Sequence, residues 1–202
     1  MKTTQIESVK YLSCCRILES EAYFLYAKLT TKIDRPEISG ITLAIAYDGL
    51  KHSKVIQELF KPITGLNKNI SQYLNQCNED FREVWKEINK FSGDLSKIDT
   101  INDEALPDLL KGLANLEDCL YEIYTFFIDS RMLKQFADVL SGFSLVTPEN
   151  LAFIIECLRE DNHKHREMLI ESSCFFNKSQ LKNKEYPAPI VKYQNPDGWI
   201  IT

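Results

Sequence analysis

Apolar residues recur along this chain at spacings of three and four, which is the pattern of one buried helix face. Gly and Pro, seven of each, gather between the periodic segments, as they do between helices. We find no alternating strand pattern of useful length. The sequence therefore predicts an all-α fold, with helices over about residues 4–32, 38–60, 69–91, 103–136 and 147–174.

The third of these segments carries large apolar residues and no charge on its apolar face. We interpret it as a crossover helix, which is needed if the second and fourth helices run parallel. Residues 1–176 are predicted to form one helical domain. The remaining residues, 177–202, are rich in Pro and polar side chains, so we expect an extended tail that packs on the bundle or on a neighbouring subunit.

Length and composition narrow the class of protein. The chain has 202 residues, enough for one domain with a sizeable core. Its net charge of −5 excludes a general nucleic-acid binder, and no apolar run reaches the roughly 20 residues of a membrane span. The N-terminus lacks the apolar stretch of a secretory signal. We therefore expect a cytoplasmic protein that uses neither nucleic acid nor membrane as a partner.

The six cysteines form no C-x-x-C pair, so a four-cysteine metal or electron-transfer site is not expected. Most lie among apolar residues at helical spacing, and we interpret them as buried reduced thiols. Cys14 and Cys15 point to different sides of one helix, so at most one of them is expected in the core.

Four predicted helices have an apolar stripe that ionisable residues interrupt near its middle. Burying several carboxylates costs many kcal/mol unless they bind protons or a cation. Carboxylates and imidazoles that converge between helices are the ligands of divalent iron, manganese or zinc. An Asp four residues before a His shares its helix face, and can ligate a metal or accept a hydrogen bond from an imidazole. The interrupting residues are Glu19, Asp48, His52, Glu117, Asp161 and His165.

The positions of the three histidines separate inward from outward candidates. His52 and His165 fall on the apolar stripes, whereas His163 lies about 200° around its helix from His165 and should face outward. The sequence Glu160-x-x-His163 is therefore not the expected ligand set. Lys51 and Lys164 directly precede the inward histidines, and we expect both to face solvent, the alternative being that they counter the charge of the carboxylates.

The chain contains an internal repeat. Leu18-Glu19-x-x-x-Tyr23-x-x-Tyr26 matches Leu116-Glu117-x-x-x-Tyr121-x-x-Tyr124. Likewise, the stretch from Asp48 to His52 matches the stretch from Asp161 to His165. The helices thus alternate between Glu and Asp/His types, which indicates two helical hairpins related by a pseudo-two-fold axis.

On these motifs the chain resembles the ferritin-like superfamily, and within it the rubrerythrin-type di-iron carboxylate proteins, over about residues 5–60 and 103–175. The resemblance implies a four-helix bundle and the metal ligands Glu19, His52, Glu117 and His165. It also places Asp48, Asp161, Tyr26 and Tyr124 around the ligands, as hydrogen-bond partners or alternative ligands.

The chain departs from this family at two positions. The family has a metal-ligating Glu three residues before each His, and those positions hold Gly49 and Asn162 here. The remaining ligands suit one metal ion, and suit two only if both Asp turn inward.

Two functions follow from these patterns. One is an iron- or manganese-dependent oxidoreductase that acts on oxygen or peroxide and receives electrons from another protein, with one or two ions of Fe, Mn or Zn as cofactor. The other is a degenerate ferritin-like scaffold or interaction protein without metal, in which Asp, His, Glu and Tyr form a hydrogen-bonded network. We expect a homodimer or higher homo-oligomer, and a protein partner for the tail. No motif of nucleophilic catalysis is present.

Overall fold

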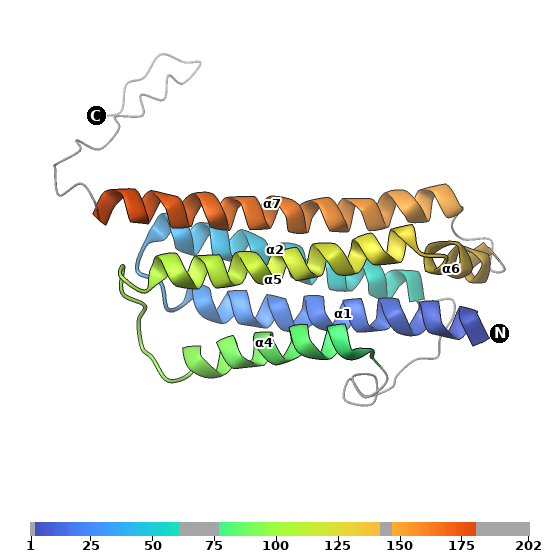
Figure 1. The fold of residues 1–202 in the computed structure, drawn as a ribbon, viewed down its shortest axis with the longest axis horizontal. Coiled ribbons are helices and arrows are strands. Elements are labelled where there is room, and N and C mark those ends of the chain that lie inside the picture. Colours follow the sequence, from blue (N-terminus) through green and yellow to red (C-terminus); the bar gives the residue numbers. More distant parts are fainter. Residues whose placement is uncertain (1–2, 61–76, 142–146, 181–202) are drawn as a thin grey trace, which may run out of the picture.

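The computed structural model describes residues 3–60, 77–141 and 147–180, and this part of the chain is helical without strands. Two pairs of long helices run along the long axis of the molecule (Figure 1). Helix α1 packs on α2, and α5 packs on α7. The helices are α1 (Thr3–Thr30), α2 (Pro36–Phe60), α4 (Glu79–Leu95), α5 (Leu106–Asp129), α6 (Met132–Ser141) and α7 (Pro148–Gln180).

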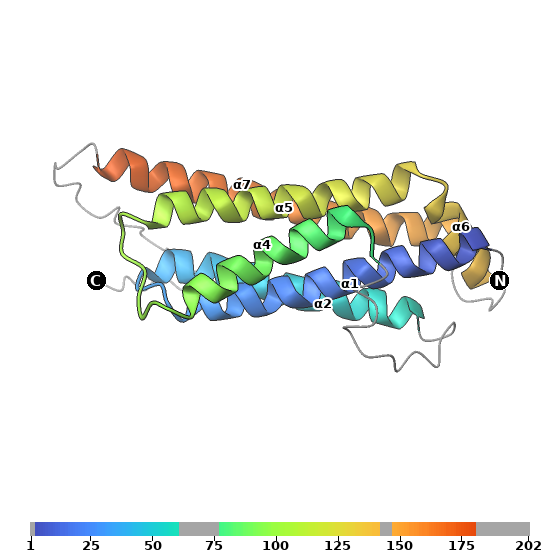
Figure 2. The same cartoon turned by 60° about the horizontal axis from the view of Figure 1, so that its bottom comes forward.

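The long helices run in two opposite directions along the molecule (Figure 1). Helices α2 and α5 point the same way, whereas α1 and α7 point the opposite way (Figure 1). Helix α4 also runs opposite to α2 and lies obliquely across α1 and α5 (Figure 2). The antiparallel relation of α1 to α5 matters for the site, because it brings the Glu of each helix level with the Tyr of the other.

Two helix starts show why the sequence folds as it does. At α7, the Thr147 hydroxyl accepts a hydrogen bond from the Asn150 N–H at 3.2 Å, and Pro148 takes the first helical position. At α4, the Asn78 side chain accepts from the Phe81 N–H at 3.3 Å. The start predicted for α7 is thus confirmed. The helix predicted over 69–91 begins only at Glu79 among the described residues, and residues 69–76 lie outside them.

The prediction of one continuous helix over residues 103–136 is wrong, because the structure has two helices there. Ser130 takes an extended backbone conformation (φ −81°, ψ 167°) that ends α5. Its hydroxyl then accepts a hydrogen bond from the Met132 N–H at 3.2 Å, which favours a new helix start. Helix α7 also continues to Gln180, past the predicted end of the domain at residue 176. The predicted extended conformation from residue 181 onward lies outside the described residues.

The core fills the space between the helix pairs and beneath α4 and α6. Its largest fully buried side chains include Tyr26, Tyr124, Phe81, Phe127 and Phe136. Helix α4 closes one side, where the rings of Phe81 and Tyr11 meet edge to face at 4.7 Å. None of the described helices is long and apolar enough to cross a membrane.

The cysteines correct the sequence-based interpretation. Cys14 and Cys77 form a disulfide with a Cα–Cα distance of 6.0 Å, and Cys15 alone is a buried thiol among those described. Both Cys14 and Cys15 are buried, because Cys77 and helix α4 pack on a second face of α1. The other three cysteines, Cys119, Cys157 and Cys174, are exposed. The predicted cytoplasmic location stays a prediction.

Candidate metal centre

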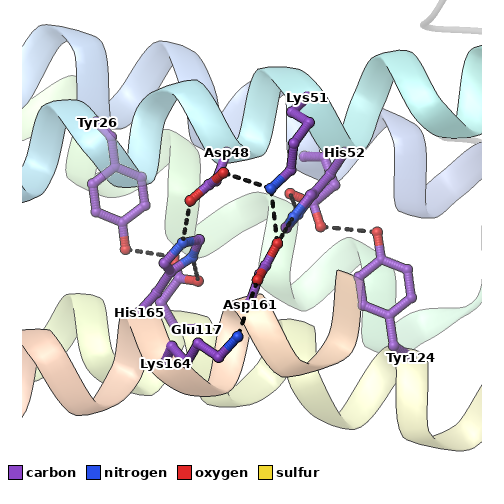
Figure 3. A network of polar contacts seen from close by, with 10 residues as sticks. Tyr26, Asp48, Lys51, His52, Glu117, Tyr124, Asp161, Lys164 and His165 are labelled. Atoms are coloured by element: carbon purple, nitrogen blue, oxygen red, sulfur yellow. Dashed lines mark hydrogen bonds and ion pairs between the residues drawn. The ribbon is translucent and has the colours of Figure 1, made fainter. Parts of the chain in front are cut away.

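Six ionisable side chains from four helices meet in one cluster (Figure 3). Helices α1 and α5 each contribute a Glu, and α2 and α7 each contribute an Asp and a His. The two Glu and two His are buried, whereas the two Asp are partly exposed. The structure therefore brings together all the residues that interrupt the apolar stripes: Glu19, Asp48, His52, Glu117, Asp161 and His165.

The imidazole of His52 lies between carboxylates of two other helices. Its Nε2 is 3.2 Å from Asp161 Oδ2, and its Nδ1 is 3.3 Å from Glu19 Oε2. The second contact is not aligned as a hydrogen bond, so among the described residues Nδ1 is a buried nitrogen without a hydrogen-bond partner. When the imidazole is neutral and Nε2 donates to Asp161, the lone pair of Nδ1 is left beside the Glu19 carboxylate.

His165 makes the corresponding two contacts on the other side, and here both are hydrogen bonds. Its Nε2 is 3.1 Å from Asp48 Oδ2, and its Nδ1 is 3.3 Å from Glu117 Oε2. Each imidazole thus contacts the Glu of its own helix pair and the Asp of the other pair. The two rings lie nearly parallel, with centroids 6.3 Å apart and an interplanar angle of 22°. The local symmetry of the sequence repeat extends to the side chains.

Two tyrosines hold the outer oxygens of the buried carboxylates. The Tyr26 hydroxyl donates to Glu117 Oε1 at 2.6 Å, and the Tyr124 hydroxyl donates to Glu19 Oε1 at 2.8 Å. Each Tyr therefore serves the Glu of the opposite helix. Because α1 and α5 are antiparallel and each Tyr follows its Glu by seven residues, the two pairs come level.

Lys51 is exposed to solvent as expected, and its ammonium also belongs to this cluster. Its Nζ donates to Asp48 Oδ1 at 2.6 Å and to Asp161 Oδ2 at 2.8 Å. The long apolar stem lets the ammonium turn back over the cluster while the side chain stays half-exposed. Lys164 is more exposed than Lys51, and its Nζ approaches only one carboxylate oxygen, Asp161 Oδ1, at 3.6 Å. The sequence signal for Lys51 is the repeated Lys-His dipeptide, which places a cation beside each inward histidine.

The contacts shift the pKa values of both imidazoles upward. Burial alone lowers the pKa of His52, but the Glu19 carboxylate and the hydrogen bond to Asp161 outweigh it and raise the pKa to about 9. Burial also lowers the pKa of His165, but the carboxylates of Glu117 and Asp48 outweigh it, so this pKa is raised as well. The hydrogen bond from His52 and the nearby Lys51 ammonium hold the pKa of the Asp161 carboxyl well below its usual range.

The two positions where the resembled family has Glu behave differently from each other. A Cβ at Gly49 would lie 3.2 Å from the backbone oxygen of Glu19, so this glycine lets α2 approach the backbone of α1 closely. The pseudo-equivalent Asn162 is buried, and its Nδ2 has no hydrogen-bond partner in the described part of the chain. Asn162 lines a narrow cavity with both Glu that has no room for a free water molecule.

The remaining histidine lies outside the cluster. The His163 side chain is exposed on α7, with its Nε2 3.4 Å from Glu167 Oε1 and its ring near Tyr121. Its outward position agrees with the helical spacing.

Within the cluster, the carboxylates and imidazoles pair with one another. Over residues 3–60, 77–141 and 147–180, no three His, Cys, Asp or Glu side chains form a group arranged to hold a metal ion. Comparisons of the chain with protein-family models, with curated proteins and with solved structures find no match.

Proposed function

We propose that this chain is a ferritin-like four-helix bundle, with α4 as the crossover, that binds a divalent transition metal in the cluster. The ligands are Glu19, His52, Glu117 and His165. Support for the bundle comes from the pairing of α1 with α2 and of α5 with α7, from the direction of α4, and from the repeat. Metal binding requires the paired side chains to turn from one another toward a common ion.

The observation that carries the proposal is the orientation of the two imidazoles. Each Nε2 is held by an Asp carboxylate, and each Nδ1 is turned to a buried Glu. Histidines that ligate metals are fixed in this way in proteins, because a carboxylate on one ring nitrogen sets the tautomer and raises the basicity of the other. The Nδ1 of His52, which has no hydrogen-bond partner among the described residues, is the atom that such a ligand presents.

The charge of the cluster also favours a cation. Four carboxylates and the ammonium of Lys51 leave a net charge of −3 when both imidazoles are neutral and the more distant Lys164 is not counted. Most of this charge is buried, and buried charge must be compensated. One divalent ion brings the net charge to −1. The ligand set of imidazole and carboxylate suits iron, manganese and zinc alike.

The surrounding residues have defined roles in this proposal. Asp48 and Asp161 orient the imidazoles, and Tyr26 and Tyr124 each hold one oxygen of a Glu so that the other faces inward. The apolar core excludes water from the buried side. A redox-active ion in such a site supplies the chemistry for reaction with oxygen or peroxide, which makes a metal-dependent oxidoreductase the activity to test.

A metal-free scaffold is the second candidate, and one observation favours it. The contacts run without a break from Tyr124 through Glu19, His52, Asp161, Lys51, Asp48, His165 and Glu117 to Tyr26. Two imidazole protons bring the cluster to the same charge of −1 as one divalent ion does. The same side chains therefore form a balanced network without metal.

Metal analysis by mass spectrometry on tag-free protein separates the two candidates. The metal-binding proposal expects near-stoichiometric iron, manganese or zinc in the wild type and its loss in Glu19→Ala/His165→Ala. If metal is present, oxygen and peroxide consumption are measured next. A wild type that contains no metal, and whose thermal stability does not respond to Fe(II), Mn(II) or Zn(II), favours the scaffold.

A further inference from the structure

The disulfide that ties α1 to the segment before α4 lines a cavity. Only 3% of Cys14 and 6% of Cys77 is exposed. Both residues nevertheless border a cavity of about 300 Å³ that opens to solvent. Ligand pockets in proteins begin at about this size, so the cavity admits a small molecule rather than a folded partner. The bond is therefore covered by protein on most sides and reachable through this cavity.

The wall of the cavity carries one cation and one anion. Glu7, Lys10 and Cys14 follow one another along α1 at spacings of three and four residues, so they share a helix face. Glu7 and Lys10 are exposed, and within the described part of the chain neither is engaged in an ion pair. A thiol that itself carries carboxylate and ammonium groups, as glutathione does, meets an opposite charge for each at this wall.

The packing around the cavity does not depend on the disulfide. Phe81 of α4 and Tyr11 of α1 both line the cavity, and their rings meet edge to face at 4.7 Å. The Tyr11 hydroxyl also donates to the backbone oxygen of Ile123 in α5 at 2.9 Å. These contacts join α1, α4 and α5 without either sulfur. Opening the bond therefore removes a covalent tie while α4 stays packed on α1.

We propose that Cys14–Cys77 is a thiol-exchange site that takes glutathione through this cavity. The Lys10 ammonium attracts the thiolate and the carboxylates of the incoming molecule. The site thereby couples the covalent attachment of α4 to the thiol–disulfide balance around the protein. It does not require the proposed metal binding.

The exchange has two steps. The thiolate of glutathione attacks one sulfur of the disulfide, the bond between the cysteines breaks, and the other cysteine leaves as a thiolate. A second glutathione thiolate then attacks the glutathione sulfur of the mixed disulfide and expels the remaining cysteine. Two glutathione molecules thus become oxidised glutathione, and the two cysteine thiolates take up the two protons. Oxidised glutathione closes the bond again by the reverse steps.

The test is the rate at which glutathione and 2-mercaptoethanol open this bond in the folded, full-length protein. Samples are alkylated at intervals, mass spectrometry measures the alkylated Cys14 and Cys77, and circular dichroism follows the helices. Lys10→Met removes the cation of the cavity wall, and Lys54→Met, at an exposed lysine of α2 outside the cavity, is the matched control. We expect the ratio of the glutathione rate to the 2-mercaptoethanol rate to fall about two- to fivefold in Lys10→Met, the factor of one exposed ion pair. The ratio should be unchanged in Lys54→Met.

The dependence on thiol concentration separates exchange from unfolding. A rate proportional to glutathione concentration, with the helices intact, supports exchange in the folded protein. Opening only at the rate of global unfolding, independent of thiol concentration, means a purely structural disulfide and overturns the proposal. Equal rate ratios in wild type and both lysine variants mean exchange without recognition, and overturn the glutathione site.

Discussion

The two helix pairs of this protein are alike at the buried ligands and unlike at their margins. The α1–α2 pair and the α5–α7 pair each supply a Glu, a Tyr, an Asp and a His, with matching contacts. They differ at two equivalent positions of the repeat. Gly49 of α2 corresponds to Asn162 of α7, and Lys51 contacts the Asp of both pairs whereas Lys164 approaches only Asp161. A function of the buried cluster should therefore depend equally on both pairs, whereas stability should depend on them unequally.

The disulfide is the largest difference between the two pairs, because it ties only α1 to the segment before α4. It closes a loop between residues 63 apart in sequence. Removing it with Cys14→Ser/Cys77→Ser should lower the free energy of unfolding by about 2–4 kcal/mol. Guanidinium denaturation without reductant measures this. Cys119→Ser, at an exposed thiol, should change stability by less than about 0.5 kcal/mol, and an equal loss there would refute the assignment.

The second prediction concerns pH, and it applies to the metal-free protein. The folded-state pKa of His52 is about 9, above the roughly 6.5 of an unfolded chain. The folded state therefore holds an extra proton between these values, so this stabilisation is complete below about pH 6.5 and is lost as pH rises through 9. The loss should be about 3 kcal/mol by urea denaturation at pH 6 and pH 9.5.

His165 should add to the same trend, because its pKa is also raised. The partly exposed His163 lies outside the cluster, so His163→Gln is the control for the replacement of a histidine on α7. Stability that stays level or increases from pH 6 to pH 9.5 would contradict the charge assignment in the cluster.

The third prediction tests whether the two pairs are equivalent at the tyrosines. Tyr26→Phe and Tyr124→Phe each leave a buried carboxylate oxygen without its donor, which should cost about 1–3 kcal/mol. The two losses should agree within about 0.5 kcal/mol, whereas Tyr47→Phe, at an exposed ring, should have no measurable effect. Thermal denaturation monitored by circular dichroism is sufficient. Clearly unequal losses would break the proposed symmetry of the cluster.

The smallest expected effect is at two glycines of α2. Gly49→Ala places a methyl group against the backbone of α1 and should destabilise the protein by about 1 kcal/mol despite the better helix propensity of Ala. Gly40→Ala meets no neighbouring atom within 4 Å and should stabilise by about 0.5–1 kcal/mol. Opposite signs in chemical denaturation support the close approach of α1 and α2 at Gly49. A stabilising Gly49→Ala would argue against it.

The sequence predicted the all-helical fold and the residues of the cluster because both follow from local periodicity. Glu19 and His52, for example, stand out as ionisable residues on otherwise apolar stripes. The break at Ser130 was missed, since the apolar pattern continues across it and only the backbone conformation ends α5. The contact between Cys14 and Cys77 is long-range, and helical spacing carries no signal for it.

The pairing within the cluster was also only partly predictable. The i,i+4 spacing placed Asp48 and His52 on one face, but the hydrogen bonds cross between helices, with His52 bonded to Asp161. Such partners depend on how the two helix pairs dock. The reach of Lys51 depends on the rotamers of a flexible side chain, which a pattern of residue types does not encode.

The most direct test of the central claim is a Zn(II) titration of metal-free protein against a fluorescent chelator, in wild type, His165→Gln and His163→Gln. These two histidines lie two residues apart on α7, yet only His165 is in the cluster. The account predicts that His165→Gln binds Zn(II) at least about 100-fold more weakly than wild type, and that His163→Gln binds it equally well. No Zn(II) binding by the wild type, or the same affinity in all three proteins, would contradict it.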